Sequence, residues 1–211
     1  MRIGLASDSH GNLPALERAL ELFRRCRVDR VFFLGGRVAD VDAVLARRSV
    51  GSREAPVPRT DAEFLSAVRG ALARQEAAPA TDPLDGRIVR VASRACPEYE
   101  TGRVPRKQVD LLEGHIATVV HDKSELDRDD IANSALLFHG NAVAPALVQI
   151  GPRCFVTPGH LRAPAPEGRP ATFCLVEVAA REVVLTVFSD ESVEQRQDRV
   201  LIGSSGKMSV R

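Results

Sequence analysis

The 211-residue sequence has no tryptophan, one tyrosine and only four cysteines, and no two of the cysteines form a C-x-x-C pair. This spacing excludes a zinc ribbon and argues against a disulfide framework, so we expect reduced thiols. With so few aromatic residues, the core must be built from aliphatic side chains and phenylalanine. The cysteines are Cys26, Cys96, Cys154 and Cys174.

Long hydrophobic runs and a strong charge of one sign are also absent. No segment approaches the roughly 18 consecutive apolar residues of a membrane span. The formal net charge of +1 gives no indication of a nucleic-acid partner. A strand pattern that starts at residue 2 leaves no room for a signal peptide, which, with reduced cysteines, predicts a cytoplasmic protein. The composition, 44% hydrophobic and 27% charged, is typical of a soluble globular fold.

The first 36 residues have the pattern of an α/β domain. Residues 2–7 form an apolar run that predicts a buried strand, and a polar turn, Asp8 to Asn12, follows it. Asn12 is a suitable N-cap for a helix, and residues 29–34 predict a second strand that ends in two glycines. In such sheets, ligands bind beyond the carboxyl ends of the strands. The helix is indicated by apolar residues at helical spacing, Leu13, Leu16, Leu20 and Phe23.

The remaining sequence predicts one domain over residues 1–188 with an insertion at about 49–86, which contains an amphipathic helix over 61–75. Residues 189–211 are polar, and we expect a peripheral extension there. The last four expected strands have short turns between them and predict an antiparallel meander. The expected strands after the insertion cover residues 87–92, 115–121, 134–139, 146–150, 153–157, 172–178 and 182–188.

Asp8 and His10, two residues apart after a strand, are good ligands for a divalent metal. The stretch that contains them, IGLASDSHGNLPALERAL, resembles the opening of the calcineurin-like metallophosphoesterases, especially the small bacterial phosphodiesterase branch. It is also similar to the non-catalytic retromer subunit of the same fold. The resemblance implies a four-layer αββα sandwich of two mixed β-sheets. It also implies a pair of metals that bind a phosphate and activate a water.

Most of the other ligand positions that the resemblance implies are substituted. The bridging aspartate position falls on Gly36, and the ligating asparagine position falls on Arg94. In VVHDKSEL the first histidine is kept as His121, while the second position is Lys123. The last pair of histidines is replaced by Asn141 and Val143.

An alternative alignment, shifted by two residues, places His139 in a ligand position, although Pro145 argues against it. If a metal binds, the expected ligands are Asp8, His10 and His121, with His139 as a further candidate. Each of these residues could equally be an ordinary turn or strand-end residue.

Three basic residues lie at or beside these substituted positions, and one of them could offset the negative charge of Asp8 in place of a metal. Arg94 and Lys123 occupy former ligand positions, and Arg37 adjoins the lost bridging aspartate. A buried carboxylate without a counter-ion is costly, so we expect a basic side chain, Arg94 first of all, beside Asp8. The other interpretation is that these long side chains reach solvent.

Three functions remain open from the sequence. The first is a pseudoenzyme that works as a protein-binding or scaffold module, without a cofactor. The second is a phosphodiesterase or phosphatase with a mononuclear site for manganese, zinc or another divalent ion. The third is a metal-free phosphate or nucleotide sensor in which Arg37, Arg94 and Lys123 bind the anion. We expect a protein partner and neither nucleic acid nor membrane.

Overall fold

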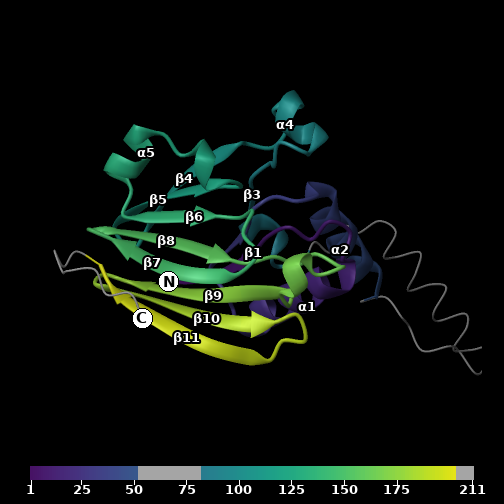
Figure 1. Ribbon diagram of the computed structural model, residues 1–211. Coiled ribbons are helices and arrows are strands. Elements are labelled where there is room, and N and C mark those ends of the chain that lie inside the picture. The colour runs from purple at the N-terminus through teal and green to yellow at the C-terminus, as the bar shows by residue number, and fades with distance from the viewer. Residues whose placement is uncertain (52–81, 203–211) are drawn as a thin grey trace, which may run out of the picture.

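The computed structural model describes residues 1–51 and 82–202, and these form two mixed β-sheets that pack face to face (Figure 1). The first sheet has six strands in the order β11-β10-β9-β1-β2-β3. Strands β1, β2 and β3 are parallel, and the others are antiparallel. The bounds are β1 Arg2–Ala6, β2 Arg30–Phe33, β3 Ile88–Arg90, β9 Thr172–Ala179, β10 Glu182–Ser189 and β11 Glu194–Leu201.

The second sheet has five strands in the order β4-β5-β6-β8-β7. Its central strands β5, β6 and β8 are parallel, and an antiparallel strand closes each edge. The parallel strands of both sheets end at the same side of the molecule. The bounds are β4 Lys107–Leu112, β5 His115–Val120, β6 Leu136–His139, β7 Pro145–Ile150 and β8 Arg153–Pro158.

Helices cover the two sheets unequally (Figure 1). The long helices α1 (Leu13–Arg25) and α2 (Val38–Gly51) pack on the first sheet, whereas the short helix α5 (Arg128–Asn133) lies on the second. The helix α4 (Pro97–Thr101) and three 3-10 turns, η1 Asp85–Arg87, η2 Lys123–Glu125 and η3 Pro166–Gly168, lie in the loops.

The core has two parts, one between the sheets and one beneath α1 and α2. Phe32 and Phe138 meet edge to face across the two sheets, with ring centroids 5.3 Å apart. Helix α1 is capped by Asn12 as expected, and its Phe23 packs directly on β1. A Cβ at Gly4 would lie 2.5 Å from the Phe23 ring, so this contact requires glycine.

The predicted fold class is confirmed, and several details of the topology are corrected. The expected meander is wrong, because β7 and β8 belong to one sheet and β9 and β10 to the other. The sequence pattern missed β4 and β11, whose exposed edge positions carry too many polar residues to show a clear apolar alternation.

The C-terminal segment and the start of the insertion differ from expectation as well. Residues 194–201 are a paired strand of the first sheet, so the expected extension at 189–211 is in part an integral edge of the domain. Helix α2 continues to Gly51, past the expected start of the insertion, and the helix expected over 61–75 lies outside the described residues. None of the described helices has the length and hydrophobicity needed to cross a membrane.

Candidate functional site: a buried aspartate with a guanidinium partner

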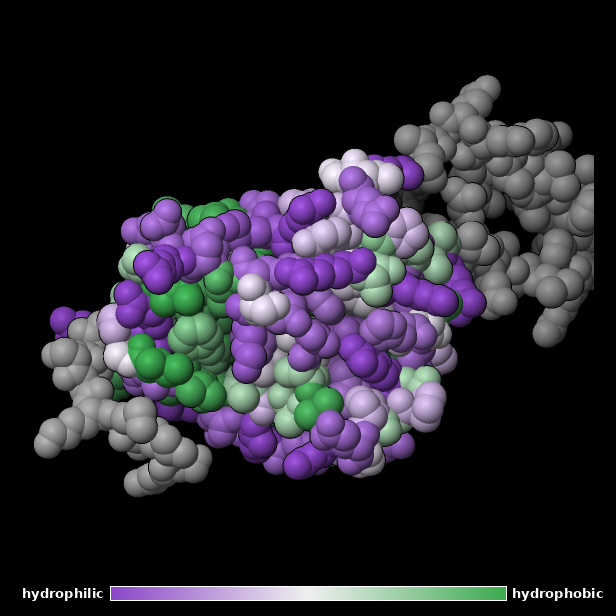
Figure 2. Space-filling view, turned by 45° about the horizontal axis from the view of Figure 1, so that its top comes forward, coloured by the Kyte–Doolittle hydropathy of each residue, from purple (hydrophilic) through white to green (hydrophobic). Residues whose placement is uncertain are grey.

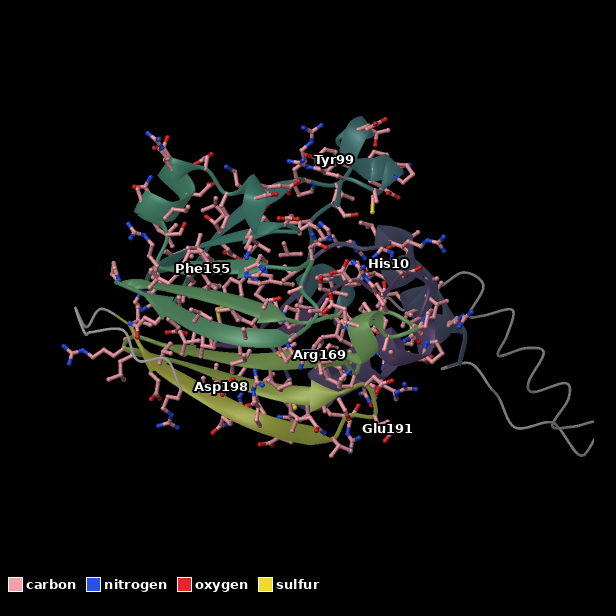
Figure 3. The ribbon with its side chains drawn as sticks, in the orientation of Figure 1. His10, Tyr99, Phe155, Arg169, Glu191 and Asp198 are labelled. Atoms are coloured by element: carbon pink, nitrogen blue, oxygen red, sulfur yellow. The ribbon has the colours of Figure 1, made fainter. Side chains whose placement is uncertain are left out.

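Loops that follow the parallel strands of both sheets meet around the carboxylate of Asp8. Asp8 follows β1, His121 follows β5, Asn141 follows β6 and Arg162 follows β8. Figure 3 shows His10 at this end of the sheets, on the same side of the molecule as α4 with its Tyr99. The site therefore lies where α/β sheets commonly bind ligands, beyond the carboxyl ends of parallel strands.

Asp8 is completely buried and accepts hydrogen bonds at both of its carboxylate oxygens. Oδ2 accepts from the Ser7 hydroxyl at 2.7 Å and from the backbone N–H of Asn141 at 2.9 Å. Oδ1 lies 3.2 Å from Nε2 of His10 and 3.3 Å from Nε2 of His121. It also accepts from Nη2 of Arg162 at 2.9 Å. The loops after β1, β5, β6 and β8 thus each place at least one hydrogen-bonding group against the carboxylate.

This environment keeps Asp8 ionised. Burial alone would raise its pKa, but hydrogen bonds from His121, Ser7 and Arg162 lower it by more. The net result is a pKa well below the ordinary range of an aspartate. Asp8 is therefore a fixed negative charge at neutral pH, and Arg162 is its permanently charged partner.

Gly36 stands where the resemblance places the bridging carboxylate, and the backbone leaves no space for a side chain there. Its φ is +96°, a value that L side chains rarely adopt. A Cβ at this position would lie 2.9 Å from the Cα of Asp8. The nearby Asp40 does not replace the missing ligand, because its carboxylate accepts from the Ser9 hydroxyl and the Gly11 N–H, each at 2.7 Å.

Arg94 and Lys123 do not stand beside Asp8, contrary to expectation. The Arg94 side chain is 70% exposed and donates to Glu125 at 3.2 Å. Lys123 lies exposed in η2. The loop after β3 directs Arg94 toward η2 and away from the carboxylate, so the expected ion pair is not formed. Arg37 is exposed, with its guanidinium close to Gly11.

Asn141 and His139 have other partners. The side chain of Asn141 donates to Asp122 at 2.5 Å, so only its backbone contributes to the site. Nδ1 of His139 lies 3.0 Å from the Gly140 carbonyl, and burial lowers the pKa of this histidine. His139 is thus not among the residues that contact Asp8, and Val143 is exposed.

The donor set does not fit a pair of metals. A binuclear centre requires a carboxylate shared by both ions, and that position is Gly36. Within residues 1–51 and 82–202, no group of three or more histidine, cysteine or carboxylate side chains could hold a metal ion. Arg162, which sequence reasoning missed, instead supplies positive charge at the carboxylate.

Comparisons with known proteins identify the class of protein. The family model of the calcineurin-like phosphoesterase superfamily domain matches residues 1–181. The chain therefore belongs to this superfamily. No curated protein matches it significantly.

Several solved structures share the fold at low sequence identity. A Streptococcus pneumoniae protein described as a predicted phosphoesterase is 18% identical, with 95% of this chain and 97% of that chain covered and a TM-score of 0.60. YfcE, a phosphoesterase from E. coli, is 21% identical, with coverages of 94% and 98% and a TM-score of 0.56. Vps29 of Chaetomium thermophilum is 14% identical, with coverages of 95% and 97% and a TM-score of 0.57. It has also been solved with a cyclic peptide.

Proposed function

We propose that this chain is a non-catalytic member of the superfamily, a protein-binding module in which an internal ion pair replaces the metal centre. One observation carries the proposal: Nη2 of Arg162 lies 2.9 Å from Oδ1 of Asp8, the ligand expected first in any metal site of this chain. A guanidinium is always charged at physiological pH and donates in a fixed plane, so it is a suitable substitute for a cation. A metal would have to displace it.

The backbone at Gly36 supports the same conclusion. A phosphoesterase with two metals needs both ions held by a common carboxylate. Here the position is occupied by a glycine with positive φ, packed against the backbone of Asp8. The absence of the bridging carboxylate thus involves the main-chain conformation as well as the side chain, and a single substitution does not restore the carboxylate.

A protein partner is supported by the outer face of the second sheet. Helix α5 covers the middle of this face, where Thr118 and Leu137 are fully buried. Large apolar side chains stay exposed on both sides of the helix: Val109, Leu111 and Ile116 on β4 and β5, and Val148 and Ile150 on β7. In Figure 2, where the top of Figure 1 comes forward, hydrophobic side chains gather toward the left, the side on which α5 lies in Figure 1. Uncovered apolar surface of this kind is typical of protein interaction sites.

Metal content and phosphodiesterase activity test the non-catalytic role. The purified protein is dialysed against manganese or zinc, and bound metal is measured by elemental analysis. Hydrolysis of an aryl phosphodiester is then assayed with manganese. We expect no stoichiometric metal and no turnover above that of the Asp8→Ala and His10→Ala variants. His10→Ala is included because its side chain is 39% exposed, so its removal should leave the protein folded. About two metals per chain, or turnover that these variants abolish, would refute the proposal.

Co-purification tests the protein-binding role. A protein that associates with the wild-type chain should be lost from Leu111→Glu and retained by Val193→Glu. Both side chains are exposed, but Val193 lies in the turn between β10 and β11, away from α5. Equal binding to both variants would show that the exposed face of the second sheet is not the interface.

The convergence of His10 and His121 on Oδ1 of Asp8 favours one alternative, a mononuclear phosphoesterase. Three protein ligands and a water are sufficient for a catalytic zinc, although these three side chains do not form a metal-binding group in their present arrangement. This function requires Arg162 to leave Asp8. One equivalent of zinc bound by the wild type and lost in His10→Ala would establish the alternative.

A further inference from the structure

Strand β4 forms one edge of the second sheet, and within the described residues its only strand partner is β5 (Figure 1). The two strands are joined by the two-residue turn Glu113–Gly114, in which both φ values are positive, as in a type I′ hairpin. Leu112 and the β5 residue opposite it flank this turn and therefore form a hydrogen-bonded pair. Because the bonding alternates along an antiparallel strand, the main-chain groups of Lys107, Val109 and Leu111 face away from β5.

The same positions of β4 carry uncovered apolar side chains. Val109 is 53% exposed and Leu111 is 65% exposed, and Ile116, which lies opposite Leu111 on β5, is 43% exposed. These side chains lie on the outer face of the sheet, the face on which Lys107 bonds to Asp130 of α5. A strand that pairs with β4 would bond to its outward main-chain groups and cover part of this apolar surface at the same time.

Two of the outward main-chain groups are bonded to side chains of β4 itself. The amide of Gln108 donates to the Val109 carbonyl at 3.0 Å, and the Asp110 carboxylate accepts from the Leu111 N–H at 2.9 Å. Both bonds link adjacent residues and are exposed to solvent, so they open at little cost. They compete with an incoming strand and make its binding weak and reversible, but they do not block the edge.

The residues of β4 complement a second copy of the same strand in one register. In a two-fold antiparallel pair the outward main-chain groups must face each other, so the longest registers pair residues 107–111, centred on Val109, or residues 108–112, centred on Asp110. The second register places Asp110 directly opposite Asp110 of the second copy, where like charges repel. The first places Gln108 opposite Asp110 of the second copy, in the closely spaced pairs where an amide donates readily to a carboxylate.

We infer that two copies of this chain associate through β4 in an antiparallel pair centred on Val109, which joins their second sheets into one continuous sheet. Val109 meets Val109 of the second copy at the axis, and Leu111 packs on the aliphatic part of Lys107 of the second copy. This pairing rests on the proposed protein-binding role, since both require the apolar outer face to be covered. Val148 and Ile150, at the opposite edge of the sheet, stay available for a different protein.

Sedimentation equilibrium of the full chain tests this dimer. The mean mass should rise from that of the monomer toward twice that value as the protein concentration increases. Val109→Pro removes the N–H at the centre of the interface from both copies and should weaken association by about tenfold or more. Proline is tolerated on an edge strand where the N–H faces solvent, so this variant should fold, which circular dichroism verifies. Leu111→Glu should also weaken the dimer, whereas Val148→Glu, on the exposed part of β7, is the matched control and should dimerise like the wild type.

The pairing of Gln108 with Asp110 of the second copy provides a test of the register. Gln108→Lys forms an ion pair at both ends of the dimer and should lower the dissociation constant severalfold, and Gln108→Glu places like charges there and should raise it severalfold. Added salt should reduce both effects. In the register centred on Asp110, residue 108 would face Leu112, and the two variants would associate equally.

Four results would overturn the inference: a chain that stays monomeric at all concentrations, a dimer that both Val109→Pro and Leu111→Glu retain, a dimer that Val148→Glu loses, and equal association of the two Gln108 variants. Failure of the dimer is distinguishable from failure of the proposed function. A monomeric chain that binds another protein through Leu111 would overturn the inference alone. Turnover with manganese would refute the non-catalytic role, while a dimer with the expected variant effects would still support the inference.

Discussion

Asp8 shows how a buried carboxylate is held by donors of the protein itself. Its two oxygens accept from Ser7, His10, His121, Asn141 and Arg162. Removing a metal from a carboxylate leaves a buried charge, which is costly unless other groups pair with it. Arg162 supplies the counter-charge, and its 36% exposed side chain keeps contact with solvent, which limits the cost of desolvating the guanidinium.

The first prediction concerns this pair. Asp8→Asn should lower the free energy of unfolding by roughly 2–4 kcal/mol at neutral pH, because it leaves Arg162 and the donors without an anionic acceptor. Urea denaturation followed by circular dichroism measures the change. Arg94→Ala serves as the control and should leave the midpoint unchanged. An Asp8→Asn protein as stable as the wild type would show that the ion pair contributes no net stability.

The effect of Asp8→Asn should also depend on pH. The pKa of Asp8 is lower in the folded than in the unfolded chain, where it is about 4. The ionised carboxylate therefore contributes its full stability above that pH, and the contribution is lost as the pH falls toward the folded pKa. The stability difference between the wild type and Asp8→Asn should be constant near neutral pH and decrease below about pH 4. A difference that is the same at acidic and neutral pH would contradict this assignment.

The second prediction concerns Gly36. Restoring the carboxylate that the family resemblance implies, with Gly36→Asp, should not create a metal site. It should destabilise the protein by roughly 1–3 kcal/mol, because φ is positive and the new Cβ meets the backbone of Asp8. Gly114→Asp separates the two causes, since Gly114 also has positive φ but a Cβ added there would meet nothing within 4 Å. If Gly36→Asp costs no more than Gly114→Asp, or if it binds manganese, the backbone argument is wrong.

Strand β4 is an exposed edge of the second sheet, and its own side chains bond to two of its backbone groups. The amide of Gln108 donates to the Val109 carbonyl at 3.0 Å, and the Asp110 carboxylate accepts from the Leu111 N–H at 2.9 Å. An edge strand with free N–H and C=O groups is a template for pairing with another chain. Here local hydrogen bonds reduce that tendency, although Val109 and Leu111 are exposed.

The third prediction follows from this edge. Asp110→Thr removes the acceptor and a charge and raises the strand propensity, so it should increase self-association. Light scattering over a range of protein concentrations measures the mean mass. Asp198→Thr on β11 is the matched control, because the other residues exposed on that strand are mainly charged or amide side chains. Equal mass for both variants at all concentrations would show that Asp110 does not protect the edge.

At the scale of the whole molecule, the two sheets bring together loops that are far apart in the sequence. Asp8 and Arg162 are separated by 154 positions, yet they form a direct ion pair. All of these loops leave the same side of the two sheets, where the parallel strands end. Because the charges in this cluster are compensated by protein groups, the folded state should not depend on a metal.

The fourth prediction tests that independence. Treatment with EDTA should leave the urea midpoint unchanged, and added manganese or zinc should not raise it. A protein with a native metal site loses stability when the metal is removed, because binding of the metal contributes to folding. Arg162→Ala provides a comparison, since metal-dependent stability that arises only in this variant would show that Arg162 excludes the ion. A wild-type protein destabilised by EDTA would contradict the prediction.

The sequence by itself determined the family resemblance, the fold class and most of the strands. These follow from local patterns: the apolar run before Asp8, the Asn12 cap and the alternating strands. It also indicated that the bridging ligand position is Gly36. Such features depend on residues that are close together in the sequence, so they can be recognised from the sequence alone. The amphipathic helix expected within the insertion lies outside the described residues and stays a prediction.

The tertiary structure decided which cation meets Asp8. Arg94, Lys123, Arg37 and Arg162 are all basic residues in loops near the same sheet edge, and nothing in their local sequence distinguishes them. The Pro158–Gly159 turn directs the following loop across the ends of both sheets, where Leu161 bonds to Ser7 and Arg162 reaches the carboxylate. Arg94 is held by Glu125 instead. Contacts between distant loops depend on the direction in which each loop leaves its strand, and that direction is set by the packing of the two sheets.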